Sequence, residues 1–282
     1  MKNTKKNIMI TNLHPFEGHP YKVQDNEEMN ALIESIQGQG VLSPIIVRPK
    51  ENTENKYEII SGHRRVRAAT KAGMTEIPAI ILPLDRDAAA IAVVDSNLHR
   101  EHILPSEKAF AYKLKMEALS HQGKAINTPS RQVVGKLETA DLISETESGR
   151  QVQRYIRLTN LITPILDMVD EGRIAFTPAV EISYLMLEEQ QMLLSEMEYN
   201  DCTPNLSQAQ RLKELSMQGK FTEERLSAIM GEEKANQKER VKIPVERIAK
   251  FFPKNYTTAQ MEDEILKMCE ARYRKRIDRD SR

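Results

Sequence analysis

A short segment at residues 61–65, Ser-Gly-His-Arg-Arg, carries side chains suited to binding an anion. It lies between an apolar run typical of a β-strand and an alanine-rich run typical of a helix. Gly62 allows a ligand to approach the backbone closely, and the first amides of the following helix are free to donate hydrogen bonds. Arg64 and Arg65 add paired donors that match phosphate oxygens. The segment therefore predicts a phosphate-binding turn, with a solvated helix start carrying two exposed arginines as the alternative.

A second set of polar side chains lies at the start of a predicted helix at residues 149–161. Arginine and glutamine at such a position reach base edges and phosphates when a helix enters the DNA major groove. A short predicted helix at 137–143 and a polar turn at 144–148 precede it, so the order is helix, turn, helix. A solvated helix face is the alternative. The candidate DNA-binding residues are the capping residue Ser148 and, on the helix, Arg150, Gln151, Gln153 and Arg154.

The charge of the chain is balanced, because its 41 basic residues cancel its 41 acidic residues. This balance argues against a basic coat that binds nucleic acid without regard to sequence, so a DNA-binding surface has to come from local clusters. Basic residues beside the helix-turn-helix are candidates for phosphate contacts that position the protein on DNA. They are Lys124, Arg131, Arg157 and Arg173.

The length of 282 residues favours two or three domains. Cys202 and Cys269 lie far apart and lack the spacing of a structural zinc site, which is typical of a reduced cytosolic protein. The polar, lysine-rich start has no apolar stretch behind it. We therefore expect a soluble, intracellular protein that does not contact a membrane.

Apolar periodicity predicts an α/β domain at the N-terminus, a small mixed sheet with helices. A helix at 25–37 is ended by Gly38 and Gly40, and Asp85 is placed to cap a helix that runs toward Asn97. The segment at 8–13 is apolar, and the three predicted strands are 45–47, 57–60 and 77–82.

The rest of the chain has helical periodicity. A helix at 106–120 leads into helices up to residue 231, in which leucine and methionine at 178–230 are expected to form a packing scaffold. Residues 231–240 are predicted to be a linker or a solvated helix. A last helix, 258–275, carries an apolar stripe and a basic end in a small helical C-terminal module. The stripe consists of Met261, Ile265, Met268 and Cys269.

Four ordered segments resemble conserved boxes of the ParB family of partition proteins. Residues 59–69 resemble its Gly-Glu-Arg-Arg box, 13–22 its first box, 40–48 its "GVLQPIIVR" segment, and 97–109 its "ENLQRE" segment with the Leu-Pro that follows. The resemblance implies a ParB-like, sulfiredoxin-like N-terminal domain at 1–118. It also implies a helical domain at 119–231 with the helix-turn-helix at 137–161, followed by a linker and C-terminal module at 232–282.

The resemblance also implies a ligand, CTP with Mg²⁺. In such a site Gly62, Arg64 and Arg65 hold the triphosphate, and His63 belongs to the same box. Gly40 and Arg48 would surround the nucleotide, and Asn97 with Arg100 would complete the pocket.

Three residues depart from the pattern of the family. His63 replaces its usual glutamate, Tyr21 an arginine, and Ser96 the acidic residue expected to be catalytic. A serine has no charge with which to hold magnesium or orient water, so we expect nucleotide binding rather than hydrolysis, with no catalytic residue. Asp95 is one residue away, a turn of about 100° on a helix.

The histidines of the N-terminal domain lack the spacing of a metal site. We therefore assign them to packing or polar contacts. They are His14, His19, His63, His99 and His102.

The function implied by the resemblance is that of a plasmid or mobile-element partition protein. It would bind a palindromic, centromere-like DNA site as a homodimer and close as a clamp under control of CTP, on nucleoid or plasmid DNA. Its N-terminal arm, with Lys2, Lys5 and Lys6, would contact a ParA-type ATPase, and its last helix would form the dimer. The alternatives are a ParB-like transcriptional regulator without nucleotide switching and a ParB-like nuclease, which lacks the dense carboxylate cluster that two-metal chemistry needs. A ParB-like kinase of free serine is disfavoured by the helix-turn-helix.

Overall fold

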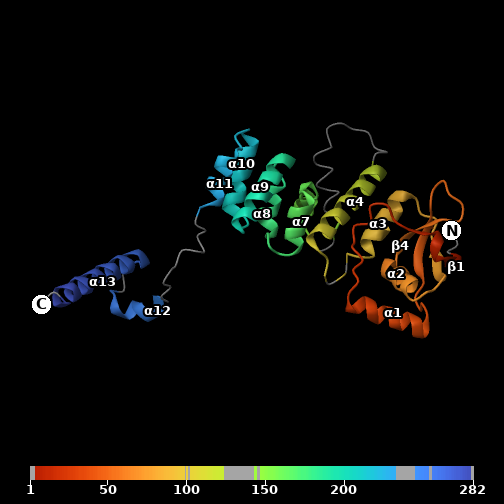
Figure 1. Cartoon of the computed structure of the whole chain (residues 1–282), viewed down its shortest axis with the longest axis horizontal. Coiled ribbons are helices and arrows are strands. Elements are labelled where there is room, and N and C mark those ends of the chain that lie inside the picture. Colours follow the sequence, from red (N-terminus) through yellow and green to blue (C-terminus); the bar gives the residue numbers. More distant parts are fainter. Residues whose placement is uncertain are drawn as a thin grey trace. The chain divides into compact units, whose positions relative to one another are not determined.

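A computed structural model describes residues 4–98, 100, 102–123, 143–144, 147–232, 245–253 and 256–280. The chain forms two compact units, Met1–Glu232 and Glu233–Arg282. The first contains a sheet with its helices and a following set of helices, and the second is helical (Figure 1). The predicted boundary near residue 118, inside the first unit, remains a prediction.

A mixed sheet of five strands forms the N-terminal part of the first unit, as the sequence predicted. Its order is β1-β5-β3-β4-β2, with antiparallel pairs β1/β5 and β3/β4 and parallel pairs β2/β4 and β3/β5. The β3/β4 register places Arg48 opposite Glu58. The strands are β1 Thr4–Met9, β2 Leu13–Pro15, β3 Ile45–Pro49, β4 Tyr57–Ser61 and β5 Glu76–Ile81.

Helices cover both faces of this sheet, because successive strand residues point to opposite sides. On one face, Met29 and Ala68 of α1 (Glu27–Gln39) and α2 (His63–Lys71) pack in one apolar cluster with Ile45 of β3. On the other, α3 (Arg86–Asp95) and α4 (Pro105–Gly123) pack in a second cluster that includes Ile60 of β4.

The caps of these helices agree with the sequence in most respects. Asp85 accepts a hydrogen bond from the amide of Ala88, which confirms it as the cap of α3. The first helix begins later than predicted, because Asn26 caps it by accepting from the amide of Met29. Gly38 lies inside α1, and the helix ends at Gly40, whose φ of 72° ordinary side chains rarely adopt.

The helix α4 joins the sheet to the helices that follow. Its residues contribute to three apolar clusters: Ala111 to the cluster on the sheet, Tyr112 to a small cluster with Val152, and Ala109 to the large helical core. That core is built from α6 (Gly149–Arg157) with the turn Leu158–Asn160, α7 (Thr163–Asp170), α8 (Phe176–Ile182), α9 (Leu187–Asn200), α10 (Leu206–Met217) and α11 (Glu223–Met230).

The expected packing role of the methionines is only partly correct. Met197 and Met230 are buried in the helical core. Met186 and Met217, however, are 68% and 74% exposed. They lie just before α9 and at the end of α10, where no further layer of described helices covers them. Among the described residues, no helix is both long and apolar enough to cross a bilayer.

The second unit consists of α12 (Val245–Ile248), the turn Ala249–Phe251 and α13 (Thr258–Asp280). The apolar stripe predicted on α13 is buried only at its start. Met261 is 7% exposed, whereas Met268 is 55% exposed and Cys269 is also exposed. A short helix such as α12 can cover only the first turns of a helix as long as α13. The predicted helix at 137–142 and most of the predicted linker at 231–240 lie outside the described residues.

Candidate functional site

The turn between β4 and α2 has a backbone that requires glycine. Gly62 has a φ of 105°, in the left-handed region. A Cβ added at this position would lie 2.7 Å from Cγ2 of Ile45 in β3. The turn is therefore pressed against the neighbouring strand, and the start of α2 is held at the edge of the sheet.

Arg65 fixes the same turn from the other side. Its Nη1 donates to the carbonyl oxygens of Ser43 and Pro44, at 2.6 and 2.7 Å, in the segment that leads into β3. In the described part of the chain, no hydrogen bond engages Nε or Nη2. Burial lowers the pKa of the Arg65 guanidinium, which still remains a cation at neutral pH. The side chain is thus anchored by one nitrogen and has donors left for an anion.

Arg64 is directed toward a different neighbour. Its Nη2 lies 2.9 Å from a carboxylate oxygen of Glu28 on α1, and both side chains are exposed. Asp25, just before α1, pairs in the same way with Arg67 and Lys71 of α2. Exposed pairs of this kind contribute little to stability and exchange partners readily, so Arg64 as a phosphate ligand remains a prediction.

Two histidine rings contact each other beside the turn. His63 is the first residue of α2, and its ring centroid lies 3.7 Å from that of His19. The edge of Tyr21 meets the His19 ring with the centroids 5.6 Å apart, and Arg100 lies over the Tyr21 ring at 5.5 Å. The structure therefore brings the first box of the N-terminal domain, residues 19–21, to the turn at Gly62.

These histidines are neutral at physiological pH. Burial lowers the pKa of His19 to about 4, and the charge of Arg100 also lowers it. Burial lowers the pKa of His63 to about 3, and His19 and Arg100 reinforce the effect. The Nε2 atoms of both rings, and that of His14, are buried and have no hydrogen-bond partner in the part of the chain that the structure describes. Packing, one of the two roles expected of these histidines, is therefore present for His19 and His63, whereas their Nε2 atoms lack the polar contact.

Three other predicted nucleotide-site residues have internal roles in the fold. The buried Arg48 donates from Nε to Glu58 at 2.7 Å and lies over the ring of Phe16. Asn97 is also buried, and its Nδ2 donates to the Val93 carbonyl at 2.8 Å. Gly40 ends α1. Binding of a nucleotide by these three residues remains a prediction.

Asp95, the carboxylate next to Ser96 in the sequence, has a partner within the protein. Asp95 forms an ion pair with Lys115 of α4, with 2.6 Å between Oδ1 and Nζ. The Ser96 hydroxyl donates to the Val93 carbonyl at 3.0 Å. Asp95 is thus tied to α4, and the loss of hydrolysis expected from Ser96 remains a prediction.

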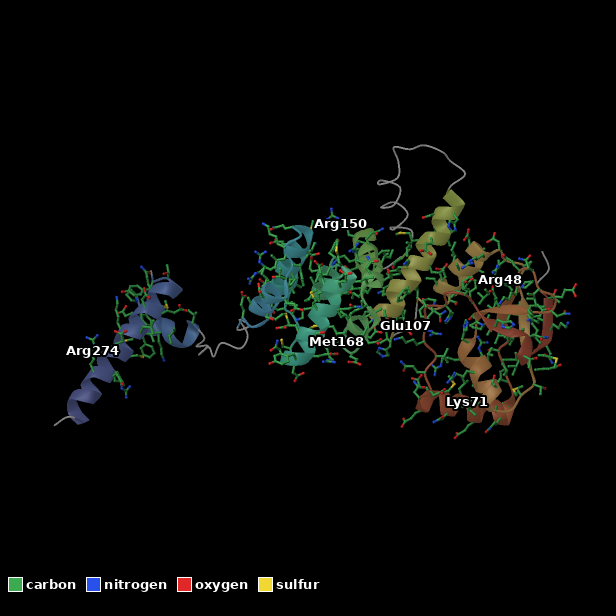
Figure 2. All side chains as sticks on the ribbon, turned by 45° about the horizontal axis from the view of Figure 1, so that its top comes forward. Arg48, Lys71, Glu107, Arg150, Met168 and Arg274 are labelled. Carbon is green, nitrogen blue, oxygen red and sulfur yellow. The ribbon has the colours of Figure 1, made fainter. Side chains whose placement is uncertain are left out.

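One contact that sequence reasoning missed joins the N-terminal part to α7. The amide of Lys22 donates to Glu107 of α4 at 2.8 Å, and its Nζ lies 3.5 Å from both Asp167 and Asp170. Asp170 also accepts from the amide and the hydroxyl of Ser106, at 2.9 and 2.6 Å. Glu107 lies at the start of α4 (Figure 2). Lys22 directly follows Tyr21, so this contact begins one residue from the group around Gly62.

The helix α6 begins as predicted, because the Ser148 hydroxyl accepts from the amide of Gln151 and caps it. Arg150 is exposed in its first turn, and no hydrogen bond or ion pair with another described residue engages it (Figure 2). Contact of this helix start with DNA remains a prediction.

The other predicted DNA-binding residues on α6 have partners within the protein. Arg154 donates to Gln151 and to Thr177, at 3.1 and 3.0 Å, and Gln153 contacts the Met116 sulfur on α4 at 3.7 Å. Arg157 donates to the Ser183 carbonyl at 2.7 Å.

Some of the basic residues predicted to contact phosphate beside the helix-turn-helix lie outside the described residues. Arg173 is exposed, with Nη1 3.8 Å from a carboxylate oxygen of Glu171. Lys124 and Arg131 lie outside the described residues.

Residues 1–98 match the family model of the ParB N-terminal domain. The N-terminal part of the chain is therefore a ParB N-terminal domain. It is 38% identical over 163 residues to a probable ParB chromosome 1-partitioning protein of Deinococcus radiodurans, a match that covers 57% of this chain and 49% of the relative. It is 37% identical over 153 residues to a nucleoid occlusion protein of Geobacillus thermodenitrificans, covering 51% and 52%. The chain thus spans about half the length of these ParB-family relatives.

A truncated ParB of Caulobacter crescentus has been crystallised in two complexes that resemble parts of this chain. The complex with CTP-γ-S is 27% identical and covers 64% of this chain and 92% of that one, with a TM-score of 0.33. The complex with centromeric parS DNA is 22% identical and covers 80% and 98%, with a TM-score of 0.42.

Proposed function

We propose that this protein is a ParB-family partition protein whose N-terminal domain binds CTP and whose α6 binds a specific DNA site. The observation that carries the proposal is the Gly62 turn. Its glycine is required by the backbone, its Arg65 is anchored to the strand segment beside it, and its helix start is free to accept an anion. These features occur in the part of the chain that matches the ParB N-terminal domain.

The residues around the turn fit the triphosphate of a nucleotide. Arg65 and the exposed Arg100 supply positive charge, and the Nε2 atoms of His19 and His63 have no hydrogen-bond partner among the described residues. The described residues contain no group of three or more His, Cys, Asp or Glu side chains that could hold a metal. Magnesium is usually bound through one or two carboxylates together with substrate phosphates, so here it would be carried mainly by the nucleotide.

Turnover of the nucleotide is expected to be slow or absent. Water attack on a phosphate needs a group that orients the water, and the position where ParB proteins carry an acid is Ser96. The hydroxyl of Ser96 and the carboxylate of Asp95 are both engaged within the protein. We propose that binding, and not hydrolysis, is the primary event in this chain.

DNA recognition is assigned to the first turn of α6. Arg150 is the arginine of this helix that has no partner among the described residues, so it can contact a base edge or a phosphate without breaking a described internal bond. Arg154 would exchange its contacts with Gln151 and Thr177 for contacts with DNA. A homodimer would place two such helices on the two halves of a palindromic, centromere-like site.

Nucleotide and DNA binding would be coupled through Lys22. The segment from His19 to Lys22 contacts the Gly62 turn through the His19 ring and contacts Glu107 and Asp170 through Lys22. A shift of this segment when phosphate binds would change how α7 is held, and α7 belongs to the same core as α6. Such a shift would serve to close the dimer as a clamp on DNA.

The remaining partners follow from the same proposal. Lys5 and Lys6, which were expected in a free arm, lie in strand β1, where they are exposed and would contact a ParA-type ATPase. The partly uncovered apolar stripe of α13 would form the dimer. The protein would then reside on nucleoid or plasmid DNA in the cytoplasm.

The test is to measure CTP binding and turnover by the full chain with and without DNA fragments selected for specific binding. Binding of CTP that becomes tighter with the selected DNA, and little phosphate release, is expected. Specific DNA binding without affinity for CTP would support a transcriptional regulator instead, which the internal contacts of Arg48 and Asn97 would favour. Cleavage of supercoiled plasmid in the presence of magnesium would support a nuclease.

A further inference from the structure

The pair formed by His19 and His63 has unused hydrogen-bonding capacity beside the Gly62 turn. Their rings contact each other at a tilt of 39° with centroids 3.7 Å apart, and the Nε2 atom of each is buried without a hydrogen-bond partner among the described residues. A buried polar atom without a hydrogen bond destabilises the fold, so native proteins keep few of them. Two such atoms in contacting rings, next to a predicted anion site, indicate that a ligand supplies the missing partner.

Among the described residues, no carboxylate acts on the pair. Arg100 acts on both imidazoles, and the Tyr21 and His19 rings are in a T-shaped arrangement. Asp95 and Glu107 act on the Tyr21 phenol rather than on the imidazoles. The same helix as His63 adds two further cations, Arg64 and Arg65. Every charged group of the described residues that acts on the imidazoles is thus positive, so an added proton needs an incoming anion.

We propose that His19 and His63 are phosphate ligands and that a nucleotide binds to them together with a proton. This inference rests on the proposed function and deepens it. Both histidines are only partly buried, and rotation about the Cβ–Cγ bond can turn a ring nitrogen from its buried edge toward a phosphate oxygen. Two rings in contact cannot both be charged, so the pair takes up at most one proton.

The proton makes the affinity for the nucleotide depend on pH. Without ligand both rings are neutral, since the pKa values of His19 and His63 are lowered to about 4 and about 3. Bound phosphate stabilises the protonated form and raises the pKa of the pair. Affinity should therefore increase as pH falls, by at most about tenfold per pH unit for one proton.

The test compares CTP affinity, measured with Mg²⁺ by calorimetry, at pH 8 and pH 6 in the wild type and in His63→Gln and His19→Gln. The ratio of wild-type to variant affinity should be about tenfold larger at pH 6 than at pH 8. The terminal phosphate of CTP also titrates between pH 6 and pH 8. Its contribution is the same for the wild type and the variants, so it cancels in the ratio of their affinities. His121→Gln is the matched control, because His121 pairs with Asp87 on the side of α3 and α4 and should leave the ratio near one.

The proton itself gives a second readout. Binding enthalpies measured in buffers of different ionisation enthalpy should show uptake of up to one proton by the wild type and less by His63→Gln. If a variant does not fold, NMR titration of the wild-type imidazoles serves instead, with at least one pKa rising by more than one unit when CTP is added.

Parallel pH profiles and unchanged imidazole titration would overturn this inference while the proposed function stands. Absence of CTP binding by the wild type at every pH would overturn the proposed function itself.

Discussion

The Gly62 turn and the start of α6 are both proposed to bind phosphate-bearing ligands, but their cations are held differently. At the turn, Arg65 is anchored by two backbone carbonyls and Arg64 by Glu28. At the start of α6, Arg150 has no partner among the described residues. An anchored guanidinium loses little freedom on binding and suits a small ligand of fixed shape. An unanchored one can adjust to a groove and suits DNA.

The largest expected effect in this comparison is the loss of the anchored cation. Arg65→Ala should weaken CTP binding by at least about 100-fold, because charge-assisted bonds to phosphate disappear and the loop at Ser43 and Pro44 is released. Specific DNA binding should change little. Calorimetry for CTP and electrophoretic mobility shift for DNA measure the two effects. A variant that loses both equally would show that the two sites are not separate modules.

Loss of the unanchored cation, Arg150, should have a smaller effect, and this effect should be confined to DNA affinity. Arg150→Ala should weaken specific DNA binding by about 1–3 kcal/mol if the side chain reads a base edge, and should leave thermal stability unchanged. Arg154→Ala should weaken DNA binding to a similar extent and also lower the melting temperature slightly, because it removes the contacts to Thr177 and the Phe176 ring. Unchanged affinity in both variants would remove α6 from the DNA interface.

Lys22, which pairs with Asp167 and Asp170, is expected to couple nucleotide binding to DNA binding. Lys22→Met removes the cation beside Asp167 and the buried Asp170 while keeping the length of the side chain. The factor by which specific DNA tightens CTP binding, typically about 5- to 150-fold in coupled systems, should fall toward one. Arg86→Met is the control, because Arg86 pairs with Glu17 on the surface away from α7. Full coupling in Lys22→Met would exclude this route.

The smallest expected effect concerns stability without ligand. The pKa values of His19 and His63 are lowered to about 4 and about 3 in the folded chain, below the usual value of 6.5. The unfolded chain therefore binds protons first as pH falls below about 6.5, so stability is complete above that pH and declines toward pH 4. Between pH 7 and pH 5 the melting temperature of His63→Gln should fall less than that of the wild type, by a few degrees. An identical decline would place the titrating group elsewhere.

The comparison also shows which features could be predicted from the sequence. The Gly62 turn, the mixed sheet and the caps Asp85 and Ser148 follow from local rules of strand period, glycine conformation and helix capping. The partners of the arginines depend on tertiary contacts. The strand register alone would predict the partner of one arginine, because antiparallel pairing of residues 45–49 with 57–61 places Arg48 opposite Glu58.

Other contacts had no local signal at all. Lys22 and Asp170 meet only because α4 brings α7 against the N-terminal part of the chain. The contact between the His19 and His63 rings depends on the path of the loop before α1, for which the sequence offered the two histidines but no spacing rule. Sequence reasoning identified these histidines and assigned them to packing or polar contacts, because burial and missing partners are visible only in three dimensions.

The long helix α4 contributes residues to the cluster on the sheet, to the small cluster around Val152 and to the core of the following helices. Because successive residues of a helix are rotated by about 100°, Ala109, Ala111 and Tyr112 lie on different sides of α4. A rotation of α4 would therefore move side chains in all three clusters. Local melting of α4 would expose apolar surface in all three clusters at once. Its amides should therefore exchange with solvent only when both halves of the first unit open together.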